Sequence, residues 1–204
     1  EFAQVEFGNG QATRQLRVFV QVAHVQLAEC AQVVGGDFQA VPFGNLRALM
    51  TRTVARLNEL GVGRNDRVAI VLPNGPDMAS AFISIASGAT AAPLNPGYRA
   101  EEFEFYLSDL NAKALVVERG SVSPAIEVAK KLGVRVIDLV ANEAAGDFSL
   151  EPREAAAVAP AANGGAAQAD DVALVLHTSG TTSRPKIVPL TQRNVSASAQ
   201  NIRA

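Results

Sequence analysis

The sequence predicts a layered α/β fold in which a parallel-rich sheet is flanked by helices. Short runs of β-branched and other apolar residues, such as 67–72 and 114–117, alternate with stretches in which apolar residues recur at helical spacing. Strands that alternate with helices pair in parallel, because each helix carries the chain back to the start of the next strand. Hydrophobic residues make up 48% of the chain and charged residues 19%, so it can bury a core and is not disordered.

Each predicted element is set by the spacing of its apolar residues and by the turn residues that end it. Apolar residues at every third or fourth position up to Gly61 indicate an amphipathic helix, and a β-branched run that stops at Pro73 indicates a buried strand. Pro76 suits the first position of a helix, where its missing N–H would have no partner. In chain order we expect a helix over 46–60, a strand over 67–72, a helix over 76–87, an extended piece over 90–94, a helix over 101–110, a strand over 114–117, a helix over 123–132, strands over 134–139, 172–176 and 187–190, and a helix from 194.

Two segments lack this alternation. Residues 1–40 carry seven glutamines against three in the rest of the chain, and we assign them as a leader without a predicted structure or function. Residues 141–169 are dominated by alanine, glycine, proline and asparagine, which indicates a surface linker too poor in large apolar side chains to pack. The chain has no starting methionine and stops at 204 inside a predicted helix, so we expect a piece of a longer protein.

Charge and composition exclude several classes of protein. The net charge of −2 argues against a nucleic-acid or anionic-membrane partner, and the most apolar stretch, 78–94, is too short and too polar to span a bilayer. A single cysteine, Cys30, excludes an intrachain disulfide and a cysteine-based zinc site. The N-terminus has no signal-peptide pattern. We therefore expect a cytoplasmic protein, with a peroxisomal location open if the source is eukaryotic.

One string carries recognisable chemistry, and it directly follows the strand expected over 172–176. It reads His177-Thr178-Ser179-Gly180-Thr181-Thr182-Ser183-Arg184-Pro185-Lys186. Hydroxyl groups and backbone N–H groups in a small loop can surround one anion, and Gly180 lets the backbone approach because it has no Cβ. Lys186 supplies positive charge, and charge-assisted hydrogen bonds are about twice as strong as neutral ones. The pattern predicts a phosphate-binding loop between two extended segments. Because Pro185 precedes the lysine and Ile187 follows it, this is not the common glycine-lysine nucleotide loop.

This string closely resembles the phosphate loop of the adenylate-forming enzymes, which include acyl-CoA synthetases, luciferases and nonribosomal adenylation domains. The resemblance covers 41–204: residues 43–46 resemble the start of an early family helix, 67–70 with 73–74 its first core strand and turn, and 88–96 its G-A-x-x-x-P-L-N-P segment. Residues 177–186 with 188–191 look most like the oxalate–CoA ligase branch, the peroxisomal CoA synthetase-like enzymes. Ser183 fits that branch, whereas Ile187 is unusual for the family.

The resemblance implies that 41–204 is an incomplete AMP-binding domain, part of the large N-terminal domain of an adenylate-forming enzyme whose C-terminal domain is absent here. Such a ligase activates a carboxylate (oxalate, or a small or fatty acid) as acyl-AMP with ATP and Mg²⁺, and then transfers the acyl group to coenzyme A. It further implies that the ATP phosphates are held by Thr178, Ser179, Gly180, Thr181, Thr182 and Lys186, with Ser183, His177 and Arg184 as candidate supporting residues. No catalytic residue and no metal ligand is expected among the 204 residues, so we expect no adenylation by the chain alone.

Other interpretations remain open at this point. The chain could be a non-catalytic nucleotide- or phosphate-binding module that shares the loop, or a truncated product without function that is joined to foreign sequence at 1–40. A lone histidine such as His177 more often packs than reacts, and Arg184 could equally contact phosphate or face solvent. Adjacent Asp170 and Asp171 are more typical of a solvated linker end than of a metal site.

Overall fold

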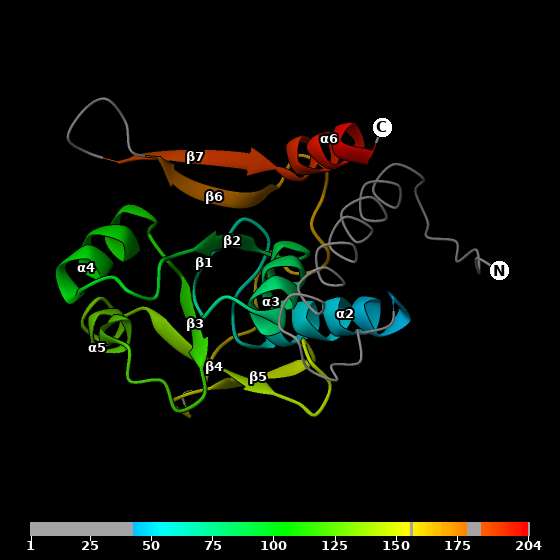
Figure 1. Cartoon of the computed structure of the whole chain (residues 1–204). Helices are drawn as coiled ribbons and strands as arrows, with labels where there is room; N and C mark the ends of the chain where they lie inside the picture. The colour runs from blue at the N-terminus through cyan, green and yellow to red at the C-terminus, as the bar shows by residue number, and fades with distance from the viewer. Residues whose placement is uncertain (1–42, 156, 179–184, 204) are drawn as a thin grey trace.

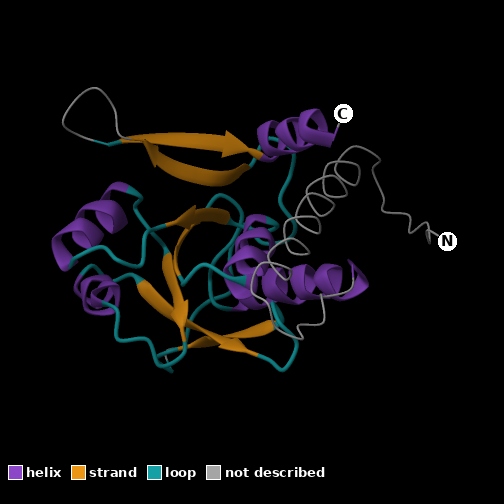
Figure 2. Cartoon of the chain, in the orientation of Figure 1, coloured by secondary structure: helices purple, strands orange, loops and turns teal. Residues whose placement is uncertain are grey.

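The structure is a computed structural model that describes residues 43–155, 157–178 and 185–203. These residues form one seven-stranded sheet with helices on both faces (Figures 1 and 2). In chain order the elements are α2 (Phe43–Glu59), β1 (Arg67–Val71), α3 (Pro76–Ala86), β2 (Thr90–Pro93), α4 (Ala100–Asp109), β3 (Ala114–Glu118), α5 (Pro124–Lys131), β4 (Arg135–Ala141), β5 (Phe148–Pro152), β6 (Val172–Thr178), β7 (Lys186–Thr191) and α6 (Gln192–Arg203). The expected elements are thus present, within a few residues of their predicted bounds.

The sheet is parallel at its centre and antiparallel at its two edges. The strand order is β5-β4-β3-β1-β2-β6-β7. The strands β4, β3, β1, β2 and β6 pair in parallel, whereas β5 and β7 each pair in antiparallel with their neighbours. The predicted parallel-rich α/β fold is therefore confirmed, and the two antiparallel edges arise where the chain returns without a crossover helix.

Alternation along the central strands produces two separate cores. On β1, Val68 and Ile70 face α2 and α3, while Ala69 and Val71 face α4 and α5. Successive side chains of a strand point to opposite faces, so a strand covered on both sides must be apolar at every position. This is why the run 67–72 has no polar residue after Arg67, and why α2 and α3 lie together on one side of the sheet in Figure 1.

Local signals fix where the helices start and how closely they pack. Pro76 begins α3, as predicted, and the Ser123 hydroxyl caps α5 by accepting a 3.3 Å hydrogen bond from Ala125 N. Gly88, just after α3, lies against α2. A Cβ at Gly88 would come within 2.7 Å of both methyl groups of Val54, so a larger residue would push the two helices apart.

The prediction of a surface linker over 141–169 is wrong for residues 148–152, which form β5. Phe148 and Leu150 are 1% and 4% exposed, because β5 pairs with β4 and these two side chains join the core beneath α2. Two large apolar side chains at alternate positions are sufficient here, since the partner strand and helix supply the rest of the packing. Further along, Gly165 N donates to Asn58 Oδ1 at 2.7 Å and Arg64 N donates to Asn163 O at 2.8 Å, so this segment is tied to the end of α2 and to the residues that follow it.

Asp171 also differs from its expected place at a solvated linker end. Its carboxylate is buried and accepts hydrogen bonds from Arg64 Nε at 2.6 Å, Asn65 Nδ2 at 2.8 Å and Gln168 N at 2.6 Å. Burial opposes ionisation of this carboxylate, but the hydrogen bonds outweigh burial and lower the pKa of Asp171. The neighbouring Asp170 is exposed as expected.

None of the helices in the described part of the chain has the length and apolar character that crossing a bilayer requires.

Candidate functional site

The motif singled out by the sequence lies on a β-hairpin at one edge of the sheet. Strands β6 and β7 are antiparallel, and their last pair before the loop is Thr178 with Lys186. This confirms that the loop joins two extended segments. It also brings the first hydroxyl and the lysine of the motif to opposite sides of the loop's mouth. The residues between them, Ser179, Gly180, Thr181, Thr182, Ser183 and Arg184, lie outside the described residues.

Alternation in β6 decides which side chains of the hairpin face inward. Val175 is 1% exposed and packs in the core beside α4 and α5, while Leu176 is 40% exposed on the opposite face. His177 therefore faces inward again, and its side chain is 7% exposed. The next residue, Thr178, is exposed. The strand thus ends with its last inward residue directly before the loop.

Lys186 is an exposed cation at the mouth of the loop. None of the ion pairs between described residues involves Lys186. An ammonium group without a carboxylate partner can give its full charge to an anionic ligand. Together with the exposed Thr178 hydroxyl, it gives the mouth of the hairpin the donors that a phosphate group accepts from.

The base of the hairpin is held by several hydrogen bonds. Thr90 Oγ1 donates to Val172 O at 2.8 Å, and Val172 N donates to Asn65 Oδ1 at 2.8 Å. After β7, the buried Gln192 donates from Nε2 to Ala86 O at 2.5 Å, which joins the start of α6 to the end of α3. Sequence reasoning missed this last anchor, because a lone glutamine at a predicted strand end gives no signal of burial.

The side chain of His177 points toward α4. Its Nε2 lies 3.1 Å from Asp109 Oδ2, and its ring makes a T-shaped contact with Tyr106 with 4.7 Å between ring centroids. Tyr106 stacks in turn on Tyr98, with centroids 4.9 Å apart and planes 15° apart. A hydrogen bond with Tyr98, together with burial, raises the pKa of Tyr106 to about 12. The expectation that His177 packs is confirmed, and the structure identifies its partners.

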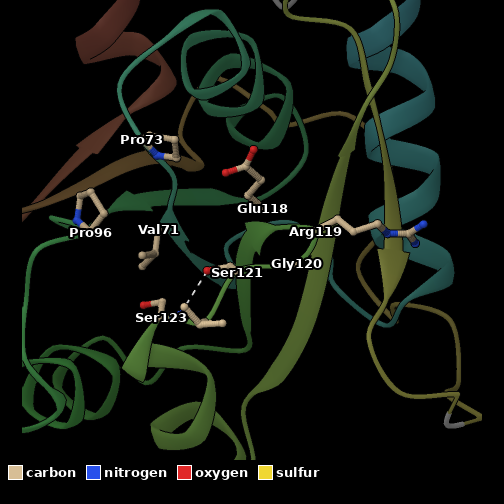
Figure 3. Close-up of a pocket in the computed structure, with 9 residues that line it drawn as sticks. Val71, Pro73, Pro96, Glu118, Arg119, Gly120, Ser121 and Ser123 are labelled. Atoms are coloured by element: carbon tan, nitrogen blue, oxygen red, sulfur yellow. Dashed lines mark hydrogen bonds between the residues drawn. The ribbon is translucent and has the colours of Figure 1, made fainter.

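A second feature at the same edge of the sheet is a pocket of about 520 Å³, which sequence analysis did not identify. It lies at the carboxyl ends of β1, β2 and β3, where Val71, Pro96, Ser121 and Ser123 line it (Figure 3). Adjacent strands β1 and β3 lead to helices on opposite faces, and ligands of α/β proteins bind at such a reversal. The strand order creates this pocket, and the sequence does not reveal that order.

Not every residue beside this pocket faces it. The Arg119 side chain extends away from the pocket toward β5, where it forms an ion pair with Glu151 (Figure 3). Ser121 Oγ accepts a 3.2 Å hydrogen bond from Ser123 N, so this serine is engaged in shaping the turn before α5. Among the residues that line the pocket, Glu118 is the one with a carboxylate side chain.

The described residues contain no group of three or more histidine, cysteine, aspartate or glutamate side chains that could hold a metal ion. Asp109, the carboxylate that contacts the hairpin, is paired with His177. No magnesium site made of such side chains alone is therefore identified among the described residues. The expectation that ATP is used with Mg²⁺ stays a prediction, and no step below depends on the ion.

Residues 20–204 match the family described as AMP-binding enzyme. The chain belongs to the AMP-binding enzyme family. The match starts at residue 20, so it includes half of the segment 1–40, which composition had set apart as a leader.

Curated relatives of this family member include several CoA ligases. It is 42% identical to an oxalate–CoA ligase of Arabidopsis thaliana over 84% of this chain and 34% of that protein. It is 36% identical to an oxalate–CoA ligase of Saccharomyces cerevisiae over 69% of this chain and 30% of that protein. The chain thus spans about a third of the length of these relatives.

Solved structures of adenylate-forming enzymes share the fold. ATP-bound MatB of Rhodopseudomonas palustris is 26% identical, with a TM-score of 0.62 over 80% of this chain and 32% of that chain. O-succinylbenzoate CoA synthetase (MenE) of Bacillus subtilis in complex with AMP is 27% identical, with a TM-score of 0.56 over 76% of this chain and 37% of that chain. The seven-stranded sheet is therefore part of an adenylate-forming fold.

Proposed function

We propose that this chain is the N-terminal part of an ATP-dependent acid–CoA ligase and that its β6–β7 hairpin holds the phosphates of ATP. Membership of the AMP-binding enzyme family supports the reaction class. The observation that carries the assignment of the hairpin is the placement of Thr178 and Lys186 opposite each other at the mouth of the loop. The reaction needs an anchor for a polyphosphate, and this hairpin presents a hydroxyl and a cation without a carboxylate partner among the described residues.

The proposed reaction has two steps. A carboxylate oxygen attacks the α-phosphorus of ATP, the bond to the β-phosphate oxygen breaks, and pyrophosphate leaves with the electron pair. The thiol of coenzyme A then attacks the acyl carbon, loses its proton and displaces AMP. In the first step negative charge grows on the leaving pyrophosphate, so a lysine held beside the β- and γ-phosphates stabilises the transition state.

The proposed ATP contacts extend beyond the described residues. Thr178 and Lys186 frame the loop, and the four residues from Ser179 to Thr182 would donate backbone N–H groups and hydroxyls to the same phosphates. Ser183 and Arg184 complete the loop on the side of Lys186 as proposed supporting residues. His177 is a further proposed supporting residue, and its side chain faces α4.

Oxalate is the first acid to test. Two of the similar relatives are named oxalate–CoA ligases, and they come from a plant and a yeast. A panel of 4-coumarate and a long-chain fatty acid separates the other substrate classes that appear among the relatives' names. We propose a small dicarboxylate as substrate on the strength of the 42% identity to the plant enzyme.

The decisive experiment substitutes Lys186 in the full-length protein. We expect Lys186→Ala to lower acid-dependent exchange of pyrophosphate into ATP by about ten- to a hundredfold, since the substitution removes one charge-assisted contact of about 1.4–2.7 kcal/mol. Lys131→Ala is the matched control, because Lys131 is an exposed lysine at the end of α5 that pairs with Glu104 of α4 and belongs to neither strand of the hairpin. Exchange that is unchanged in Lys186→Ala would refute the assignment. ATP binding without any exchange would favour the non-catalytic module.

A further inference from the structure

The far end of the β6–β7 hairpin is only weakly joined to the rest of the molecule. Strand β6 pairs in parallel with β2, with Leu174 opposite Ala91. Beyond Val175, β6 pairs with β7 alone among the described residues. Figure 1 shows this two-stranded ribbon running past the sheet toward the side of α4. An isolated two-stranded ribbon is marginally stable, so side-chain contacts must set its direction.

Three inward side chains make those contacts. Val175 from β6 and Ile187 from β7 pack against the core beside α4 and α5. His177 is the third, and it adds a directional polar contact to the apolar packing, because its Nε2 lies 3.1 Å from Asp109 Oδ2. Within the described part of the chain, this is the one side-chain hydrogen bond that joins residues 176–189 to another element. Apolar contacts allow sliding, whereas a hydrogen bond fixes distance and angle.

We propose that His177 is a positioning residue that latches the phosphate-binding hairpin to α4 through Asp109 and so places Thr178 for the phosphates of ATP. This inference rests on the proposed function of the hairpin. Thr178 is the next residue along the chain, so a rotation of the strand at His177 moves the first hydroxyl of the loop directly. A misplacement of about 1 Å in a reacting complex costs up to about a hundredfold in rate.

Histidine fits this place because it meets two needs with one ring. The ring packs against Tyr106 in a T-shaped contact, and a ring nitrogen reaches the Asp109 carboxylate. A phenylalanine would supply the packing alone, and an alanine neither contact. Tyr106 is itself held by its stack on Tyr98, which lies in the loop after β2. The latch therefore connects the hairpin to the same edge of the sheet that forms the pocket.

The test compares single and double substitutions in the full-length protein. We expect His177→Ala and Asp109→Ala each to raise KM for ATP by about three- to tenfold, the loss expected for one hydrogen bond, while KM for coenzyme A stays unchanged. The double variant should be no worse than either single variant, because both remove the same contact. His177→Gln should restore much of the ATP affinity, since its amide can donate to Asp109. Ser108→Ala, at the exposed neighbour of Asp109, is the control.

Each outcome decides the proposal. If Lys186→Ala weakens ATP binding while His177→Ala and Asp109→Ala do not, the latch is wrong and the proposed function stands. Effects that multiply in the double variant, or KM values for all substrates that rise together with a lower Tm, also overturn the latch. If Lys186→Ala has no effect, the proposed function fails and the latch fails with it. Should His177→Ala not fold, Asp109→Ala at its 39% exposed side chain decides the question alone.

Discussion

The central sheet and the β6–β7 hairpin are built by opposite rules. Strands β1 and β3 are covered by helices on both faces, and every residue from Val68 to Val71 is buried. In the hairpin, β7 has no fully buried residue, and Pro189 lacks the N–H that a central strand would need. The central sheet thus carries the stability of the fold, and the hairpin carries the proposed chemistry on a small number of contacts. The orientation of a ligand-binding loop can therefore change without any change in the core residues that support it.

The largest expected difference is in the cost of removing a leucine. Leu115→Ala, in the middle of β3 at 0% exposure, should lower the free energy of unfolding by about 2–5 kcal/mol, because it leaves a cavity between two packed layers. Leu176→Ala, on the open face of β6, should change it by less than about 0.5 kcal/mol. Urea denaturation of both variants measures the two changes in the free energy of unfolding. Equal changes would contradict the difference between the central sheet and the hairpin.

An intermediate effect is expected at the joint between the two regions. Asp171→Asn removes a buried carboxylate from Arg64 and should cost about 2–4 kcal/mol. The folded-state pKa of Asp171 is lowered, so the unfolded chain takes up its proton first as pH falls. The stabilisation is therefore fully present above the unfolded pKa of about 3.9, and it is lost as the pH drops through the lower folded value. Unfolding curves from pH 7 to pH 3 should show a smaller acid loss in Asp171→Asn than in the unsubstituted protein, and an identical loss would contradict this.

The smallest of the three effects tests how tightly the helical layer is packed. Gly88→Ala should cost about 1–3 kcal/mol, since the new methyl group would overlap both methyls of Val54. Combining it with Val54→Ala frees that space, so the double variant should be more stable than the sum of the two single costs predicts. Thermal unfolding of the three variants gives the coupling. Strict additivity would mean that the two helices do not touch at this point.

Much of the fold could be predicted from local patterns. Helical spacing, β-branched runs and residues such as Pro76 located the elements within a few positions of their observed bounds. The exception is β5, where Phe148 and Leu150 lie in a segment dominated by alanine, glycine, proline and asparagine, and two alternating apolar residues are too short a pattern to predict a strand. Their burial depends on β4 and α2, which are provided by other parts of the chain, so no local pattern could reveal it.

The candidate site divides in the same way. The hydroxyl and glycine content of 177–186 pointed to phosphate binding, because those chemical groups recognise an anion in any fold. The contact between His177 and Asp109 joins residues 68 positions apart, and sequence reasoning gave no sign of it. Asp171 was misjudged for the same reason, since its partner Arg64 is 107 positions away.

The amino-acid sequence alone thus determined the alternation of strands and helices and the chemical character of the hairpin loop, both of which depend on neighbours within a few residues. The tertiary structure alone decided the strand order, the pocket that this order opens beside β1, and the direction in which His177 holds the hairpin. These depend on which distant segments meet, and burial and hydrogen bonding between such segments are settled only when the whole sheet has assembled.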